Sequence, residues 1–464
     1  MSQQYSLPVR RPGPGTPVTV VGLARSGAAA AQWLLKLGCI VRVTEAASSP
    51  ALKEKAQELA SLGAMVELGK HTKKFVEDSH LVVASPGVPL TAQPLRWARL
   101  LHLPVVGELE LGSWYCPGRM VAVTGSNGKS TVVTLLGEIL KAGGRPTVVG
   151  GNLGTPLCSL LEQITPQTLV VLEVSSFQLE MSLAFHTEIA CILNITENHL
   201  DRHRSFTQYA AEKARLFSYQ KESSWAVLNA DDPVSFSFRN CARGRLATFS
   251  RTKKGVGAFG ERGWLRLDLP WVSGSVCRRE DLLRPGDHHV ENALAAICMA
   301  GLLGVKPETM GEALRTFRGL AHRQEVIATI DGVTFVNDSK STTVASGMKA
   351  LEAAPAKVVL IAGGRDKGSN FRILRNFKEK LKAAILIGED GPKIEASLKG
   401  STTLVRAGSL REAVQTSFQL AKRGEWVLLS PMCTSFDMFR DFEERGELFS
   451  EEVKALARGL SCAA

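Results

Sequence analysis

Short apolar runs alternate with amphipathic stretches along the chain. Apolar runs at 17–21, 40–44 and 81–84 are separated by polar and helix-like segments, and further runs occur at 120–124 and 357–362. Strands that alternate with helical stretches predict α/β units with parallel sheets. The runs that begin near 17, 120 and 357 each lead into a glycine-containing turn. The pattern therefore predicts an α/β fold built from three such starts.

These starts divide the chain into three expected domains, at 1–107, 108–319 and 320–464. A length of 464 residues agrees with three domains, because domains average roughly 150 residues. Between Arg239 and Arg284 the pattern changes to short strands with glycine turns, which predicts an excursion inside the middle domain.

Charge is unevenly distributed. The chain has a formal net charge of +11, and 239–284 contains eleven Lys or Arg against four Asp or Glu. A basic stretch can bind nucleic acid, but this one carries few aromatic residues spaced for base stacking. We therefore favour a solvated face and expect no nucleic-acid partner.

Composition also bears on the compartment. The chain is 44% hydrophobic and 22% charged, which is typical of a globular protein and excludes a disordered, collagen-like or coiled-coil chain. No apolar run approaches the ~20 residues that cross a bilayer, and Pro and Gly interrupt the N-terminal segment where a signal peptide needs an apolar core. The nine cysteines form no CxxC pair. We expect a cytoplasmic monomer with reduced cysteines and no membrane insertion.

The strongest chemical signal is the segment at 125–131, with the sequence GSNGKST. It follows an apolar strand and opens a helix, so its backbone N–H groups can converge on phosphate oxygens. Lys129 can reach the β- and γ-phosphates and the Ser130 hydroxyl can bind Mg²⁺. Only two residues separate the glycines, fewer than in the usual phosphate-binding loop. A glycine turn without a ligand is the alternative.

Three further residues follow or flank apolar strands. Glu173 ends the run at 170–173, the usual position of a second Mg²⁺ ligand in phosphate-loop enzymes; a solvated strand end is the alternative. His199 follows the next apolar run, and we expect it at the same sheet edge. Lys213 lies on a helical stretch, where an exposed helix surface is the default interpretation.

The chain resembles the Mur ligase family. The resemblance rests on the order and spacing of several motifs: GSNGKST at 125–131, GGNLG at 150–154, LEVSSFQLE at 172–180, LNITENHLD at 193–201, NDSKST at 337–342 and SPMCTSFD at 430–437. It implies a Rossmann-like N-terminal domain for a UDP-sugar, a central ATPase domain and a Rossmann-like C-terminal domain for an incoming amino acid.

The resemblance also implies residue roles. Lys129, His199 and Lys213 would be catalytic, with Lys213 carbamylated. Two Mg²⁺ ions would be held by Ser130, Glu173, His199 and Lys213. ATP would be bound by Gly125, Ser126, Asn127, Gly128, Lys129, Ser130, Thr131, Asn292, Arg323 and Asp338. The UDP-sugar would contact Arg25, Ser26, Glu45, Ser85, Gly87 and Asn152. Thr342, Lys367, Ser435 and Phe442 would form a D-glutamate pocket.

Two departures concern the N-terminal domain. Ala24 replaces the middle glycine of a dinucleotide-binding turn. Relatives carry an Asp-Thr-Arg cluster for uracil where this chain has Glu45, Ala46 and Ala47, which leaves only Glu45 as a side-chain candidate for uracil in that turn.

The implied activity is the ATP-dependent ligation of D-glutamate to UDP-N-acetylmuramoyl-L-alanine through an acyl phosphate, a step of peptidoglycan precursor synthesis. Three alternatives remain open. The chain could be another Mur ligase or a folylpolyglutamate synthase, which share the shortened loop. It could be an NAD-dependent oxidoreductase built on Gly22 to Gly27, with Glu45 on a ribose. It could also bind precursors without ligating them.

Overall fold

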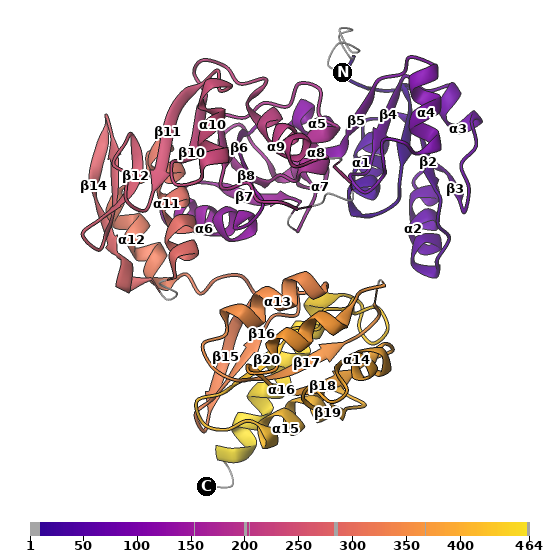
Figure 1. Ribbon diagram of the computed structural model, residues 1–464. Coiled ribbons are helices and arrows are strands. Elements are labelled where there is room, and N and C mark those ends of the chain that lie inside the picture. The colour runs from indigo at the N-terminus through magenta and orange to yellow at the C-terminus, as the bar shows by residue number, and fades with distance from the viewer. Residues whose placement is uncertain are drawn as a thin grey trace. The chain divides into compact units, whose positions relative to one another are not determined.

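The computed structural model describes residues 10–152, 154–198, 202–203, 205–282, 286–366 and 368–461, apart from the side chains at 345, 460 and 461. The chain divides into two compact units, Met1–Phe317 and Arg318–Ala464. The first unit contains two sheets and the second contains one (Figure 1).

The first sheet has five parallel strands in the order β3-β2-β1-β4-β5. The strands are β1 Pro17–Val21, β2 Ile40–Glu45, β3 Met65–Leu68, β4 Leu81–Ala84 and β5 Val105–Gly107. The helices are α1 Arg25–Lys36, α2 Pro50–Ser61, α3 Lys74–Glu77, α4 Gln93–Leu100 and α5 Glu108–Tyr115. Along β1, Val18 and Val20 pack into the core beneath α1, whereas Val21 packs toward α4. Both faces of the sheet are therefore covered.

The second sheet has nine strands in the order β14-β13-β12-β11-β10-β9-β6-β8-β7. Its parallel part comprises β6 Arg119–Thr124, β7 Thr147–Gly151, β8 Leu169–Glu173, β9 Ile189–Ile192, β10 Trp225–Asn229, β11 Arg245–Ser250 and β12 Gly257–Glu261. Two antiparallel strands follow, β13 Trp264–Leu269 and β14 Val272–Arg278. This extension is the excursion predicted between 239 and 284.

Helices cover both faces of the second sheet. They are α6 Lys129–Ala142, α7 Leu157–Leu160, α8 Ser176–Glu180, α9 Phe206–Ala214, α10 Pro233–Ser237, α11 Asp287–Leu302 and α12 Pro307–Thr316. Val121 and Val123 pack toward α6 and α11, whereas Ala122 packs with residues of α7, α8 and α9. Because β6 lies between β8 and β9, the carboxyl ends of these three parallel strands meet at one edge of the sheet.

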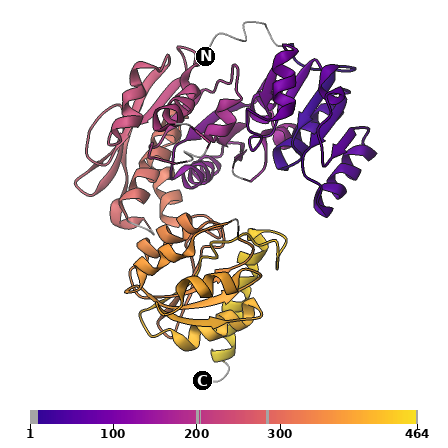
Figure 2. The ribbon, with the colours of Figure 1, turned by 45° about the vertical axis from the view of Figure 1, so that its right-hand side comes forward.

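The second unit has six strands in the order β15-β16-β20-β17-β18-β19. They are β15 Glu325–Ile330, β16 Val333–Asn337, β17 Val358–Gly363, β18 Leu381–Ile387, β19 Thr403–Arg406 and β20 Trp426–Leu429. Only the β15–β16 pair is antiparallel. Helices α13 Val344–Ala353 and α14 Gly391–Leu398 cover one face, and α15 Leu410–Leu420 and α16 Phe442–Ser461 cover the other (Figure 2).

The three sheets confirm the predicted α/β class with three domains. The eight cysteines within the described residues are all free. Across the same residues, no helix combines the length and apolar character that a membrane span requires.

Candidate functional site

A glycine loop connects β6 to α6. Gly128 adopts a left-handed conformation with φ +83° and immediately precedes the first residue of the helix, Lys129. A Cβ atom at Gly128 would lie 2.3 Å from the Oδ1 atom of Asn292, a residue of α11. A larger residue at 128 would therefore push the Asn292 side chain aside. The loop predicted to hold phosphates and Asn292, which is also predicted to bind ATP, therefore lie against each other.

Asn194, just beyond β9, fixes the shape of this loop. Its carbonyl oxygen accepts a hydrogen bond from the Ser126 N–H at 2.8 Å. Its side-chain Oδ1 accepts from the Asn127 N–H at 2.9 Å, and its Nδ2 donates to the Asn127 carbonyl at 3.2 Å. The Ser126 hydroxyl in turn lies 3.0 Å from the Tyr209 hydroxyl of α9. Sequence reasoning missed Asn194 and Tyr209, although Asn194 lies inside the quoted motif LNITENHLD.

Glu173 ends β8 beside the loop and is 3% exposed. Its Oε2 atom accepts a hydrogen bond from the Ser130 hydroxyl at 2.5 Å, and its Oε1 atom accepts from Asn152 Nδ2 at 2.6 Å. The structure thus brings together Ser130, Glu173 and Asn152. It excludes a solvated strand end for Glu173.

This oxygen-rich pair fits Mg²⁺. A protein typically holds Mg²⁺ with one or two carboxylates, and the ion keeps several waters or substrate phosphates as its other ligands. A carboxylate and a hydroxyl at the start of a phosphate loop meet that requirement. Among the described residues, no group of three or more His, Cys, Asp and Glu side chains is arranged to hold a metal. His199, the expected ligand of a second ion, lies outside the described residues.

Lys213 of α9 also contacts the glycine loop between β6 and α6. The side chain is 2% exposed, so the helix-surface interpretation is wrong. Its Nζ donates to the Gly125 carbonyl at 2.9 Å and lies 4.7 Å from the centre of the Tyr209 ring. Burial and then the positive charge of Lys129 lower the pKa of Lys213 from 10.5 to about 6, against an opposing effect of Glu173. The amine is therefore largely neutral at pH 7.

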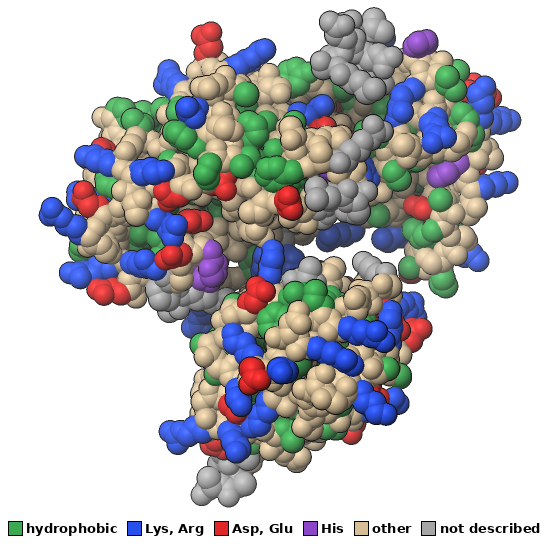
Figure 3. All heavy atoms as spheres, in the orientation of Figure 1, with side chains coloured by type: hydrophobic (Ala, Val, Ile, Leu, Met, Phe, Trp, Pro, Cys, Tyr) green, Lys and Arg blue, Asp and Glu red, His purple; other side chains and the backbone are tan. Residues whose placement is uncertain are grey.

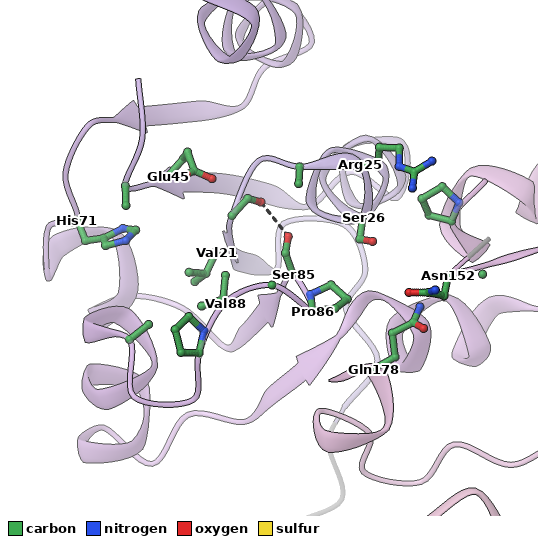
Figure 4. A pocket seen from close by; sticks show the side chains of 18 of the residues that line it. Val21, Arg25, Ser26, Glu45, His71, Ser85, Pro86, Val88, Asn152 and Gln178 are labelled. Atoms are coloured by element: carbon green, nitrogen blue, oxygen red, sulfur yellow. Dashed lines mark hydrogen bonds between the residues drawn. The ribbon is translucent and has the colours of Figure 1, made fainter. Parts of the chain in front are cut away.

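A cavity of about 540 Å³ lies in the first unit, near the carboxyl ends of β1, β2 and β4. All six residues predicted to contact the UDP-sugar line it: Arg25, Ser26, Glu45, Ser85, Gly87 and Asn152. Figure 4 shows Glu45 and His71 toward one end and Arg25, Ser26, Asn152 and Gln178 toward the other. Since Asn152 also bonds to Glu173, the second end of the cavity adjoins the phosphate loop.

The two ends of this cavity differ in chemistry. At one end α1 begins at Arg25, so unpaired backbone N–H groups and a guanidinium are available to an anion. Gly27 permits α1 to begin this close to the turn after β1, because a Cβ atom there would lie 1.9 Å from the Gly22 carbonyl oxygen. At the other end, the Glu45 carboxylate accepts the N–H groups of Leu23 and Ala47, each at 2.9 Å. Glu45 therefore holds two loops in place.

In the second unit, three loops follow the adjacent strands β16, β20 and β17. Asp338 follows β16 and is 2% exposed. Its Oδ2 atom accepts from the Ser430 hydroxyl at 3.0 Å and its Oδ1 atom accepts from the Gln324 N–H at 3.2 Å. Burial is the main cause that raises the pKa of Asp338 to about 6. Arg323, by contrast, is exposed.

The residues predicted for D-glutamate belong to these loops or to the start of α16. Ser435 is 2% exposed, whereas Thr342 and Phe442 are partly exposed. Lys367 lies outside the described residues. The fully buried Arg445 of α16, which sequence reasoning missed, ties two of the loops together. Its guanidinium donates to the Ser339 hydroxyl and carbonyl, each at 2.9 Å, and to the Cys433 carbonyl at 3.3 Å.

The basic stretch between 239 and 284 carries many paired charges. Arg251 lies within 4 Å of Asp231, Asp287 and Glu291, and Arg266 pairs with Glu261. Figure 3 shows acidic and basic side chains interspersed over the left-hand part of the first unit, where β11 to β14 lie. This mixture favours the solvated face over a continuous basic patch.

Comparisons with known proteins define the family. The chain matches the N-terminal domain of MurD-like Mur ligases over 16–107, the Mur ligase middle domain over 123–300 and the Mur ligase glutamate ligase domain over 322–433. It is 43% identical to the UDP-N-acetylmuramoylalanine–D-glutamate ligase of Pelotomaculum thermopropionicum over 446 residues, which cover 95% of this chain and 98% of the relative. It is 42% identical to the ligase of the same name from Koribacter versatilis, over 96% of this chain and 98% of that relative.

The chain therefore belongs to the Mur ligase family. Members of this family use ATP and Mg²⁺. Solved structures share the fold: the UDP-N-acetylmuramate-alanine ligase MurC of Thermotoga maritima has a TM-score of 0.55 at 19% identity and covers 94% of this chain and 99% of its own. MurF of Acinetobacter baumannii has a TM-score of 0.57 at 19% identity, over 85% of this chain and 88% of its own. The oxidoreductase alternative is excluded.

Proposed function

We propose that this chain ligates D-glutamate to UDP-N-acetylmuramoyl-L-alanine with conversion of ATP to ADP and phosphate, in the synthesis of peptidoglycan precursors. The observation that carries the proposal is the cluster of Lys129, Ser130, Glu173 and Lys213 beside a cavity of about 540 Å³ that Asn152 joins to it. The relatives at 41–43% identity with this name support the choice of substrates. The cytoplasm, which supplies ATP, is the compartment that this reaction requires.

ATP is bound by the loop from Gly125 to Thr131 and by Asn292. The N–H groups from Gly128 onward, at the start of α6, supply donors to the phosphates, and Lys129 supplies a mobile positive charge. In the second unit, Arg323 and Asp338 are proposed to contact the ribose and phosphates. Ser130 and Glu173 would hold one Mg²⁺, and Lys213 and His199 would hold a second. When bound, these ions would neutralise charge on phosphate oxygens.

The chemistry begins with a poor acylating agent. A carboxylate would have to expel oxide, so its oxygen first takes the γ-phosphoryl group of ATP and ADP leaves. The amine of D-glutamate then attacks the carbonyl carbon, the bond to phosphate breaks, and the nitrogen loses a proton to give the amide. Both steps build negative charge near Lys129, whose ammonium stabilises it. The N–H groups of the glycine loop orient the phosphates for in-line transfer.

Lys213 is proposed to carry a carbamate. Its neutral amine attacks CO₂, an N–C bond forms, and the nitrogen loses a proton, which converts the buried amine into an anionic oxygen ligand. The lowered pKa of Lys213, caused by burial and by Lys129, favours the neutral amine that this reaction requires. Lys213→Ala is expected to lose most activity, and acetate is expected to restore part of it. Full activity of Lys213→Ala without added acid would contradict the proposal.

The amino-acid pocket is proposed to comprise Thr342, Lys367, Ser435 and Phe442. A buried hydroxyl such as that of Ser435 selects strongly, because an amino acid that leaves it without a partner loses a hydrogen bond. D-Glutamate is therefore expected to be the substrate, whereas L-glutamate, L-lysine and meso-diaminopimelate are not.

A phosphate-release assay tests the function directly. The purified chain is given ATP, Mg²⁺, UDP-N-acetylmuramoyl-L-alanine and one of these four amino acids at a time. We expect phosphate release and an amide product with D-glutamate alone. Robust turnover with a diamino acid would assign the chain to a sister ligase, and tight substrate binding without turnover would make it a binding protein.

A further inference from the structure

One end of the cavity contains a histidine that the sequence did not single out. His71 lies in the loop between β3 and α3 and lines the cavity together with Glu45 and Ala46. Figure 4 shows its imidazole extending from that loop toward the cavity. The start of α1, which suits phosphate groups, lies toward the opposite end. A nucleoside diphosphate seated on α1 would therefore direct its base toward His71.

A buried network fixes the orientation of this imidazole. Thr44 is fully buried at the end of β2, and its hydroxyl oxygen lies 2.7 Å from His71 Nδ1 and 2.7 Å from Glu67 Oε1. Glu67 also accepts the N–H and the hydroxyl of Thr72, both at 2.9 Å. The Glu67 carboxylate thus accepts all of these hydrogen bonds, and the Thr44 hydroxyl is the donor in the bond between Thr44 and Glu67.

The proton count then assigns the tautomer. Because the Thr44 hydroxyl donates its one hydrogen bond to Glu67, its oxygen can only accept from His71, so Nδ1 of the ring carries the hydrogen. The other ring nitrogen, Nε2, carries a lone pair when the ring is neutral. The cavity end at His71 therefore offers a fixed hydrogen-bond acceptor.

We propose that His71 determines base specificity by accepting a hydrogen bond from N3–H of uracil. Uracil has a donor at N3, whereas cytosine has a lone pair there, which would oppose the lone pair of Nε2. The inference rests on the proposed function, since it names the group that recognises the base of the UDP-sugar. His71 would provide the side chain that recognises uracil, which the turn after β2 lacks because it carries Ala46 and Ala47.

The test is a binding measurement on the full chain with UDP, CDP and 3-methyluridine 5′-diphosphate. The matched variant is His71→Asn, because the Asn Nδ2 group can still donate to Thr44 while the acceptor at Nε2 is lost. His71→Ala is the second variant, and His80→Ala, an exposed histidine of the same domain, is the control. Calorimetry gives the three dissociation constants for each protein.

We expect the unmodified chain and His80→Ala to bind UDP about tenfold more tightly than either of the other two ligands, the effect of one unsatisfied polar group. Both His71 variants should bind all three ligands with similar, weak affinity. With the sugar nucleotide, they should raise KM and leave kcat unchanged, because the contact acts equally in the ground and transition states.

Three results would overturn the role of His71: equal binding of UDP and its 3-methyl derivative by the unmodified chain, retained selectivity in His71→Asn, or an equal loss for all three ligands. In each of these cases UDP binding and D-glutamate-dependent phosphate release by the unmodified chain would persist. A chain that bound no uridine nucleotide and released no phosphate would instead overturn the proposed function itself.

Discussion

Lys129 and Lys213 donate hydrogen bonds to the same atom, the carbonyl oxygen of Gly125, at 2.8 and 2.9 Å. Two ammonium groups so close together repel each other, and Lys213 is the more deeply buried. The charge of Lys129 is accordingly the second cause, after burial, of the lowered pKa of Lys213. The loop thus separates the roles of the two lysines: one supplies a positive charge to the phosphates, and the other is available as a neutral amine.

The first prediction concerns the positive charge. Lys129→Ala should reduce phosphate release by ~10³-fold or more, because the charge stabilises the transferring phosphoryl group. The fold should be retained, since the Lys129 side chain donates to two carbonyls of its own loop. Lys141→Ala, at an exposed lysine near the end of the same helix, is the matched control and should keep normal turnover. Near-normal turnover of Lys129→Ala at saturating ATP would show that the loop does not act on the phosphates.

The second prediction uses the pKa of Lys213. The folded value of about 6 lies below the ordinary value of 10.5. Between these two pH values the unfolded chain holds a proton at this position that the folded chain lacks, so the free energy of unfolding rises with pH. The destabilising effect of Lys213 is absent above pH 10.5, grows as the pH falls and is complete below pH 6.

Lys213→Met should remove this dependence. In CO₂-free buffer, urea unfolding should show that the stability gained by the variant increases as the pH is lowered from 10.5 toward 6, and then becomes constant. Lys141→Met should show no such trend, because Lys141 is exposed. A gain for Lys213→Met that does not vary with pH would contradict a neutral buried amine.

The fold could be predicted because its signals are local. Each apolar run at 17–21, 120–124 and 357–362 leads into a glycine turn, and β1, β6 and β17 form at these positions within one residue. Ser130 and Glu173 could also be predicted, since a strand end and a helix start lie at the sheet edge in any parallel α/β unit.

Other parts of the site depend on packing between distant segments. The burial of Lys213 follows from the way α9 packs against the glycine loop, which its spacing along the helix does not reveal. Arg445 lies in the first turn of α16, directly after Glu443 and Glu444, yet it is fully buried. The orientation of His71 is set by Thr44, 27 residues earlier in the chain.

The third prediction concerns Asn194, which holds the backbone of Asn127 on both sides. Asn194→Ala should raise KM for ATP by about tenfold, because the loop N–H groups lose their fixed orientation. Asn194→Asp should raise KM for ATP further, since it keeps the acceptor but adds negative charge beside the phosphates. Asn229→Ala removes a similar strand-end side chain, whose one hydrogen bond within the described part of the chain comes from the Asp231 N–H, and should leave KM for ATP unchanged. An unchanged KM in Asn194→Ala would show that the loop keeps its shape without this clamp.

The fourth prediction concerns Arg445. Removal of its guanidinium in Arg445→Met leaves the carbonyls of Ser339 and Cys433 without a donor in the core, at a cost of about 3 kcal/mol or more. These residues anchor the loops that contain Thr342 and Ser435, so KM for D-glutamate should rise as well. Arg445→Lys keeps the charge but loses the forked geometry, and should be intermediate in both measurements. Arg411→Met, at an exposed arginine of α15, is the control for both urea unfolding and kinetics. Arg445→Met with normal stability would contradict the role of these hydrogen bonds.

The last prediction concerns the turn after β2, where Ala46 lines the cavity and Ala47 donates its N–H to Glu45. The double variant Ala46→Thr with Ala47→Arg adds a hydroxyl and a guanidinium at the end of the cavity where we propose that the base binds. We expect these donors to bond to the uracil carbonyls, so KM for the sugar nucleotide should fall. The value of kcat should hardly change, because the added contacts act on a part of the substrate remote from the reacting carboxylate and favour ground and transition states equally.

Ser48→Arg adds the same charge one residue beyond the turn, at an exposed position outside the cavity lining, and should leave KM nearly unaltered. A change in kcat of more than about threefold would contradict this location of the base. A fall in KM of equal size in Ser48→Arg would attribute the effect to long-range attraction of the diphosphate rather than to recognition of uracil.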